Sequence, residues 1–284
     1  MNFDIDRYVA SVAALDDSDI DYDDFRLRPL PDDALRCLRY MHDVEHHTVC
    51  YLRDLLVTRA HDDPVITTFL TMWAYEEFWH GEAIGKVLRA HGEIAGRPRI
   101  DAARERAGSG RLGTLATMFA SSLTEHIVTV SLTWGAVNEW TTQAAYVRLA
   151  QRTGHPTLTE LVRRIAKQEG RHIDFYASEA TRRLENRRAQ RMTRLALSRF
   201  WTPVGSGVMP RAETEHLITY LFGDEEGAQM AHRIDRRIDR LPGLSGLALI
   251  DEARRDYATT GALTDSAAHV GIGRSRIDDV QSAA

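Results

Sequence analysis

Two Glu-x-x-His sequences constrain the fold of this chain of 284 residues more than any other feature. Glu77 and His80 form the first, and Glu169 and His172 form the second. Residues three positions apart lie on one face of an α-helix, so the two side chains of each pair can reach the same point in space. One such pair is common on solvated surfaces, and its significance depends on what accompanies it.

A lone Glu precedes each pair, Glu45 the first and Glu139 the second. The two lone Glu residues are 94 positions apart and the two pairs are 92 positions apart, so the whole set is duplicated with nearly constant spacing. A repeated Glu and Glu-x-x-His on four helices is typical of buried two-metal sites, in which carboxylates neutralise the ions and imidazoles supply neutral donors. The sequence therefore predicts six metal ligands: Glu45, Glu77, His80, Glu139, Glu169 and His172.

The first ligand has rivals, because His42, His46 and His47 flank Glu45. Adjacent residues point about 100° apart on a helix, so these side chains cannot all face one site. Only Glu45 preserves the repeat, and its position beside an apolar stripe would cost several kcal/mol without a partner or a metal.

Helical spacing of apolar residues predicts an all-α chain. We expect long helices from about Pro31 to His61, over 64–91, over 111–153 with a possible break, and over 157–188, where a basic stretch (182–199) continues the last helix. Residues 93–110 would be the longest connection, and shorter helices are expected at about 211–222, 225–240 and 245–258. We divide the chain into an acidic N-terminal arm (1–28) interpreted as a solvated tail, one domain (29–260) and a loose tail (261–284).

The composition excludes several classes of protein. A net charge of −5 argues against general nucleic-acid binding. No apolar run approaches the roughly 20 residues that span a bilayer, and the N-terminus lacks the pattern of a signal peptide. With only two cysteines, a disulfide framework is not expected, and we predict a cytoplasmic protein.

Three segments resemble one known family. They are Trp73 to Gly81, which contains Glu76-Glu77-x-x-His80-Gly81, then Glu139 with Thr142 three positions on, and Glu169-Gly170-Arg171-His172. Together they are similar to the soluble acyl-[acyl-carrier-protein] desaturases (fatty acid desaturase type 2) of the ferritin-like di-iron carboxylate superfamily. The resemblance extends over residues 30–200 and more faintly to 258. It implies a ferritin-like four-helix bundle with additional C-terminal helices, and a di-iron domain over residues 29–260.

The resemblance also implies an activity, cofactors and partners. The expected protein is a dioxygen-dependent oxidoreductase with two Fe ions, or a Mn/Fe pair, that desaturates a carrier-linked fatty acyl chain. Its partners would be an electron donor such as ferredoxin and an acyl carrier protein. We also expect the protein to form a homodimer, and the apolar stretch Ser121–Trp134 is a candidate interface. The family places a hydroxyl beside the site of dioxygen reaction, which corresponds to Thr142, one turn after the bridging candidate Glu139. Gln168 departs from the family, which has an acidic residue there.

Other functions remain open at the level of the sequence. The same ligands support hydroxylation or N-oxygenation, and a non-catalytic ferritin-like iron-binding protein would share them. A radical-generating ribonucleotide reductase subunit would need a Tyr within reach of the metals, and the sequence does not identify one. The Arg-rich segment 182–199 fits either an acidic carrier or plain solvation.

Overall fold

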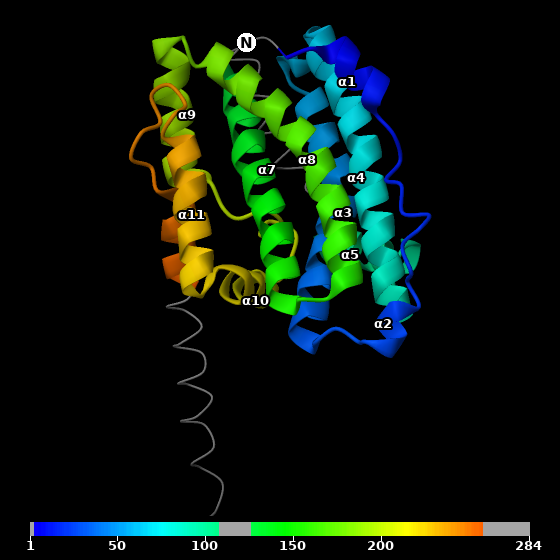
Figure 1. The fold of residues 1–284 in the computed structure, drawn as a ribbon. Coiled ribbons are helices and arrows are strands. Elements are labelled where there is room, and N and C mark those ends of the chain that lie inside the picture. The colour runs from blue at the N-terminus through cyan, green and yellow to red at the C-terminus, as the bar shows by residue number, and fades with distance from the viewer. Residues whose placement is uncertain (1–2, 108–125, 258–284) are drawn as a thin grey trace, which may run out of the picture.

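The computed structural model of this protein describes residues 3–107 and 126–257, and every regular element in these ranges is a helix (Figure 1). The prediction of an all-α fold is confirmed. The bounds are α1 (Ile5–Ser11), α2 (Asp24–Leu27), α3 (Asp32–Leu56), η1 (Arg59–Asp62), α4 (Pro64–Ala90), α5 (Arg97–Ala107), α7 (His126–Thr153), α8 (Pro156–Arg183), α9 (Arg187–Phe200), α10 (Arg211–Phe222) and α11 (Glu225–Ile238). Residues 249–257 form a further helix.

Four of the helices form an antiparallel bundle built from two hairpins. Helix α3 packs on α4 and α7 packs on α8, while α4 also contacts α8 and α3 also contacts α7 (Figure 1). The chain passes from the end of α4 to the start of α7 at the opposite end of the bundle. We expected only a connection at 93–110, but α5 occupies much of it and packs on α3. The expected helix over 111–125 lies outside the described residues.

Local signals set where the bundle helices begin. The Asp63 side chain accepts hydrogen bonds from the backbone N–H groups of Val65 and Ile66 at 3.0 and 3.3 Å, and Pro64 occupies the first turn of α4. Pro156 opens α8 in the same way, with His155 at the cap. A proline in a first turn loses no helical hydrogen bond, and a capping side chain satisfies a donor left open there.

The basic stretch after α8 is a separate helix, so the prediction of one helix over 157–188 is wrong at its C-terminal end. Helix α8 ends at Arg183, and the Asn186 side chain accepts from the N–H groups of Arg188 and Ala189 to start α9. A strong N-cap here outweighs the continuous helical pattern of the sequence.

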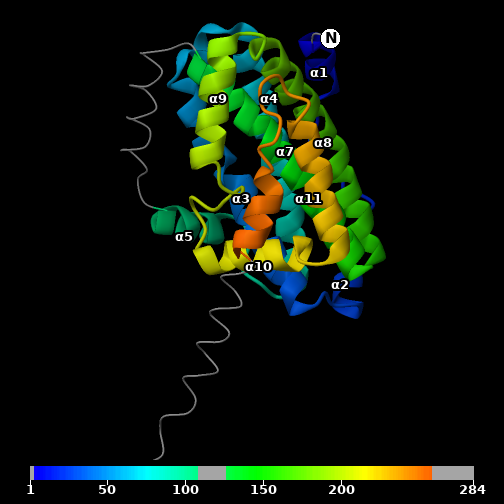
Figure 2. The ribbon, with the colours of Figure 1, turned by 90° about the vertical axis from the view of Figure 1, so that its left-hand side faces the viewer.

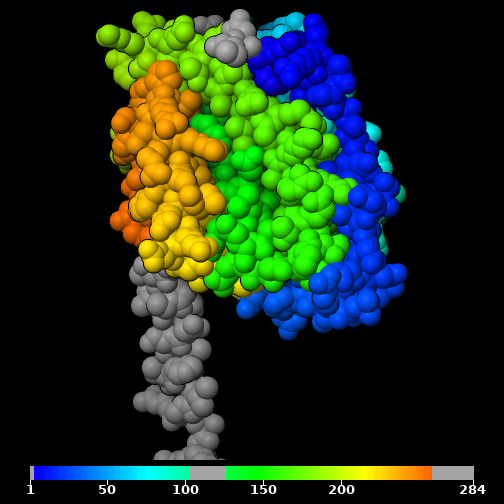
Figure 3. Space-filling view, in the orientation of Figure 1, coloured from blue at the N-terminus to red at the C-terminus, as the bar shows by residue number. Residues whose placement is uncertain are grey.

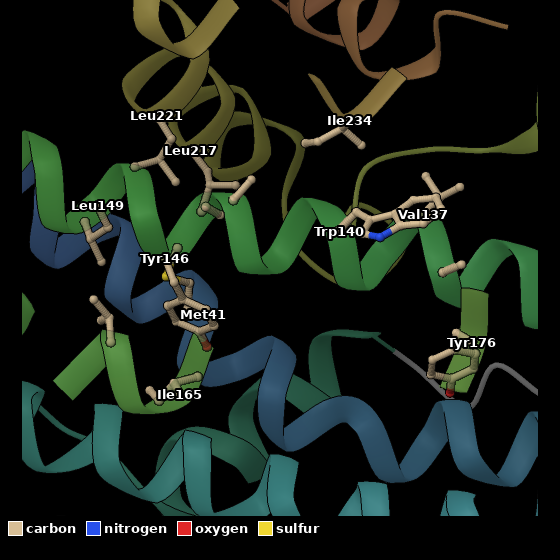
Figure 4. Close-up of a cluster of buried hydrophobic side chains, with 14 of the residues drawn as sticks. Met41, Val137, Trp140, Tyr146, Leu149, Ile165, Tyr176, Leu217, Leu221 and Ile234 are labelled. Carbon is tan, nitrogen blue, oxygen red and sulfur yellow. The ribbon is translucent and has the colours of Figure 1, made fainter. Parts of the chain in front are cut away.

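Helices α9, α10 and α11 cover the side of the bundle formed by α7 (Figure 2). Leu217 and Leu221 of α10 and Ile234 of α11 join Trp140 and Leu149 of α7 in a buried apolar cluster (Figure 4). The additional helices thereby bury a face of α7 that would otherwise be exposed to solvent.

The N-terminal arm is not the solvated tail that its acidic sequence indicated. Tyr8, Leu15 and Phe25 are buried, and α1 packs against α4. The space-filling view shows the arm lying along the bundle beside α8 (Figure 3). Apolar residues spaced through the acidic run supply enough contact surface to dock it.

The stretch expected to form a dimer interface is used inside the chain. Within its described part, 126–134, the side chains of Val128, Val130 and Leu132 are buried in the protomer, and Trp134 is half-buried. Residues Ser121 to Glu125 lie outside the described residues. The expectation of a homodimer itself remains a prediction. Among the described helices, none combines the length and the apolar character needed to cross a membrane.

Candidate metal centre

All six predicted ligands meet in the middle of the four-helix bundle. Helix α3 supplies one of them, α4 two, α7 one and α8 two, and each side chain is buried: Glu45, Glu77, His80, Glu139, Glu169 and His172. They are drawn inward because each occupies the apolar stripe of its helix, where bundle packing removes water. Six polar side chains in such a place require partners or ions.

The ligands form two groups that share two members. Glu45, Glu77, His80 and Glu169 can each offer an atom within 4.8 Å of the others, and so can Glu77, Glu139, Glu169 and His172. Glu77 and Glu169 therefore lie between the two groups, where a carboxylate can bridge two ions. Glu139 belongs to one group only, so it does not have the bridging position that we expected for it.

The pKa values of the clustered residues show that the site requires positive charge. Burial raises the pKa of Glu45 well above its ordinary value, and the charge of Glu77 adds to this. Burial and the charges of Glu169 and Glu77 raise the pKa of Glu139 in the same way. Burial alone would lower the pKa of His80, but the carboxylates of Glu169 and Glu77 raise it to about 9. Four carboxylates this close need compensating cations, which are protons in the metal-free protein.

Within the cluster, one carboxylate oxygen has no hydrogen-bond partner in the described part of the chain. Glu169 Oε1 is buried without an accepted hydrogen bond among the described residues, and His80 Nδ1 lies 3.4 Å away from it. A buried oxygen of this kind is costly unless an ion takes the open position. The donor set of carboxylate oxygens and imidazole nitrogens, with this open oxygen, fits a pair of iron or manganese ions.

The outer nitrogen of each imidazole is held by a residue of the opposite helix. His80 Nε2 lies 2.8 Å from Gln168 Oε1, and His172 Nε2 lies 2.9 Å from Glu76 Oε2. A proton on each Nε2 satisfies these acceptors and leaves Nδ1 as the nitrogen that faces the cluster. The site is thus nearly two-fold symmetric, except that an amide stands at 168 and a carboxylate at 76.

Two further donors fix the lone carboxylates. The Trp73 indole N–H donates to Glu139 Oε1 at 3.0 Å, and the Tyr146 hydroxyl donates to Glu45 Oε1. Tyr146 is completely buried between α7 and its neighbours (Figure 4). The sequence did not identify this tyrosine as one within reach of the metals. Its position seven residues after Glu139, two turns along the same helix, is the signal that could have found it.

A cavity of about 280 Å³ adjoins the cluster between α3 and α7, and its walls include Glu45, Glu77, Glu139 and Thr142. A smaller cavity of about 60 Å³ shares Val44, Glu45, Thr142 and Val204 with it, and the rest of its wall is mostly apolar, with Thr141 and Arg254 as exceptions. Thr142 therefore lies where the two cavities meet. Its neighbour Thr141 donates to the carbonyl of Val137 at 2.8 Å, whereas the Thr142 side chain lines both cavities.

Comparison of the chain with protein-family models, with curated proteins and with solved structures found no match. The resemblance in the ligand segments consequently rests on those residues alone, and the function has to be argued from the geometry of the site.

Proposed function

We propose that this protein is a di-iron, dioxygen-dependent oxidoreductase. The observation that carries the proposal is the pair of buried ligand groups that share Glu77 and Glu169. Two shared carboxylates can keep two ions close enough to act together. Two bound ferrous ions would supply the electrons and the Lewis acidity needed to reduce dioxygen.

The chain itself would supply a dry and shaped site. The Nε2 contacts of His80 and His172 hold both imidazoles, and burial limits the contact of the carboxylates with water to the side that faces the cavity. The cavities provide room beside the ligands for a substrate, and Thr142 presents a hydroxyl at their junction. Such a hydroxyl can donate a hydrogen bond or transfer a proton where charge develops.

For the substrate we infer a fatty acyl chain linked to a carrier, as the resemblance to acyl-[acyl-carrier-protein] desaturases implies. The two cavities meet at Glu45 and Thr142, and the smaller one has mostly apolar walls, so together they suit an extended chain passing the metals. Removal of two vicinal hydrogens would give an alkene. The two electrons and two protons from the substrate, with two electrons from a donor such as ferredoxin and two protons from solvent, would reduce dioxygen to two molecules of water. Oxygen insertion by a hydroxylase or an N-oxygenase is the alternative, and mass spectrometry separates the outcomes by a loss of two hydrogens or a gain of oxygen.

The direct test of the metal centre is anaerobic loading with Fe²⁺, followed by metal counting and Mössbauer spectroscopy. We expect two coupled ions per chain in the parent protein and none in Glu169→Ala, with helical content preserved. Glu160→Ala is the matched control, because Glu160 lies on the exposed side of the same helix and pairs with Arg163 and Arg164. A Glu169→Ala protein that keeps two coupled ions would disprove the ligand assignment. Loading with mixed metals separates Fe/Fe from Mn/Fe.

A non-catalytic iron-binding protein is distinguished by turnover. An enzyme consumes oxygen in proportion to substrate and reductant, whereas a storage protein accumulates many irons per chain. Accumulation of iron without substrate-dependent oxygen consumption would rule out the oxidoreductase.

One contact favours a second candidate function, the generation of a tyrosyl radical. The Tyr146 hydroxyl donates to the ligand Glu45 inside the fully buried cluster, so the ring could lose an electron to an oxidised metal pair. Electron paramagnetic resonance after exposure of the iron-loaded protein to oxygen tests this candidate. A radical signal that disappears in Tyr146→Phe supports it, and a protein without a radical signal but with substrate turnover excludes it.

A further inference from the structure

The N-terminal arm reaches the outer side of both histidine ligands. Helix α1 carries Tyr8, which is 3% exposed and packs against the rings of Phe69 and Phe3. The arm continues past Ala13 along the same side of the bundle (Figure 3). Two chains of hydrogen bonds lead from it to the metal ligands, and a contact of 3.5 Å from Gln168 Nε2 to Glu76 Oε1 joins them.

The first chain leads to His172. The Tyr8 hydroxyl donates to Glu76 Oε2 at 2.9 Å, and His172 Nε2 lies 2.9 Å from that same oxygen. Arg171 donates to the other oxygen of Glu76. Glu76 is completely buried, so each of these donors contributes to keeping its carboxylate fixed in one orientation.

The second chain leads to His80. Gln168 Oε1 contacts His80 Nε2 at 2.8 Å, and the Gln168 amide N–H donates to the backbone carbonyl of Ala13 at 3.1 Å. The amide needs both partners because it is itself buried. The carboxylate expected at this position could accept a hydrogen bond from His80 Nε2 but, when ionised, could not donate one to the Ala13 carbonyl. Glutamine does both, so it connects the arm to the ligand.

The arm has little stability of its own. Helix α1 contains 7 residues, which is too short to persist in water without tertiary contacts. Its order therefore depends on docking, and docking places Tyr8 and the Ala13 carbonyl against the residues that orient the imidazoles. Outer hydrogen-bond partners of metal-binding histidines change metal affinity when they are removed.

We propose that the N-terminal arm is a positioning element of the metal centre, so that docking of the arm and binding of the metal pair strengthen one another. The inference depends on the proposed metal centre but not on the substrate or the reaction. Because binding linkage is reciprocal, the arm must increase metal affinity by the same factor by which metal stabilises the docked arm.

The variant that tests the proposal is Tyr8→Phe, which keeps the ring packing and removes only the hydroxyl that contacts Glu76. Tyr22→Phe is the matched control, because Tyr22 belongs to the same arm and its hydroxyl donates to Asp17 at 2.6 Å, away from the ligands. Both proteins and the parent are titrated with Co²⁺, whose absorption reports the coordination of each ion. Hydrogen exchange of residues 3–15 is measured with and without the metal.

We expect Tyr8→Phe to bind one of its two Co²⁺ ions about tenfold more weakly and with a changed absorption band. A tenfold loss is the lower end of the range by which metal affinity falls when an outer hydrogen-bond partner of a ligand is removed. Tyr22→Phe should match the parent. Co²⁺ should slow hydrogen exchange of the arm in the parent, and less so in Tyr8→Phe. Equal affinities and spectra in all three proteins, with arm exchange unaffected by Co²⁺, would overturn the proposal while leaving the metal centre intact. A parent protein that binds no metal pair would instead overturn the proposed function and this inference with it.

Discussion

Thr142 forms part of the wall of both cavities and also offers a hydroxyl that could act in the reaction. It lines both cavities beside Glu45, and its side chain is half-buried. Thr142→Val preserves the shape and removes the hydroxyl. We predict that the variant retains both ions but releases more hydrogen peroxide per oxygen consumed, because a proton donor is lost from a water-poor site. Oxygen uptake and product formation are measured together, and unchanged coupling would leave Thr142 as a helix residue without a catalytic role.

Position 135 has to be glycine because the ring of Tyr176 packs closely against its backbone. Gly135 lines the larger of the two cavities beside the ligands. A Cβ at this position would also lie 2.5 Å from the ring of Tyr176, which is buried. Gly135→Ala should destabilise the protein by roughly 1–3 kcal/mol, the usual cost of overpacking. Urea unfolding measures this effect.

The control for that experiment is Gly170→Ala on α8. Its added Cβ would have its nearest neighbour at 3.8 Å, an ordinary contact. The substitution should stabilise the helix by about 0.5–1 kcal/mol because alanine is the better helix former. Equal effects of the two substitutions would contradict the packing argument.

At the scale of elements, one arginine joins the bundle to the additional helices. Arg148 of α7 is 1% exposed, and its guanidinium donates to the Leu221 carbonyl at 2.9 Å, to Asp224 at 2.6 Å and to Glu226 at 2.6 Å. These acceptors lie at the end of α10 and the start of α11. Arg148→Met should cost about 1–3 kcal/mol and loosen α10 and α11 first, because it removes the donor to the carbonyl of the buried Leu221, whereas Asp224 and Glu226 remain accessible to water.

Arg152→Met is the control for Arg148, since Arg152 lies one turn further along α7 and pairs with the same Asp224 at 3.0 Å from a more exposed position. Its loss should cost at most about 1 kcal/mol. Urea unfolding and hydrogen exchange of residues 211–238 measure both variants. Similar decreases in the free energy of unfolding for the two variants would show that the burial of Arg148 does not determine how strongly α7 holds α10 and α11.

At the scale of the whole molecule, α9 presents a basic surface that would suit an acidic carrier. Arg187, Arg188 and Arg191 are exposed on this helix. Arg183, which belongs to the same basic stretch, instead pairs with Asp63 at 2.8 Å and with Glu179, so it contributes to the bundle. Reversing the charge of the three exposed residues should slow reaction with carrier-linked substrate by roughly tenfold at low salt and weaken the salt dependence.

The control reverses three exposed arginines on α11, namely Arg233, Arg236 and Arg237. This variant has the same change in net charge, so it separates a local docking surface from the general field of the protein. Steady-state rates are compared at several salt concentrations. Equal rates for the two variants would assign the arginines of α9 to solvation.

The features of this protein that depend on short spacings along the chain can be read from its amino-acid sequence. The i, i+3 separation of Glu77 from His80 and of Glu169 from His172 follows from helix geometry, and Asp63 with Pro64 marks a helix start through contacts within one turn. The duplicated spacing then identified Glu45 and Glu139, because a repeated hairpin places equivalent residues at equivalent depths.

The residues that surround those ligands depend on how the helices and the N-terminal arm pack together. Tyr8 contacts Glu76 across 68 positions of sequence, and Tyr146 contacts Glu45 across 101. The seven-residue spacing from Glu139 is the one local sign that Tyr146 faces the ligands, whereas nothing in the local pattern of Tyr8 distinguishes it from a core residue. The acidic arm that carries Tyr8 has the composition of a solvated tail. These contacts exist because the bundle buries polar atoms that cannot remain unpaired, and the partner of each is the group that packing brings within hydrogen-bond distance.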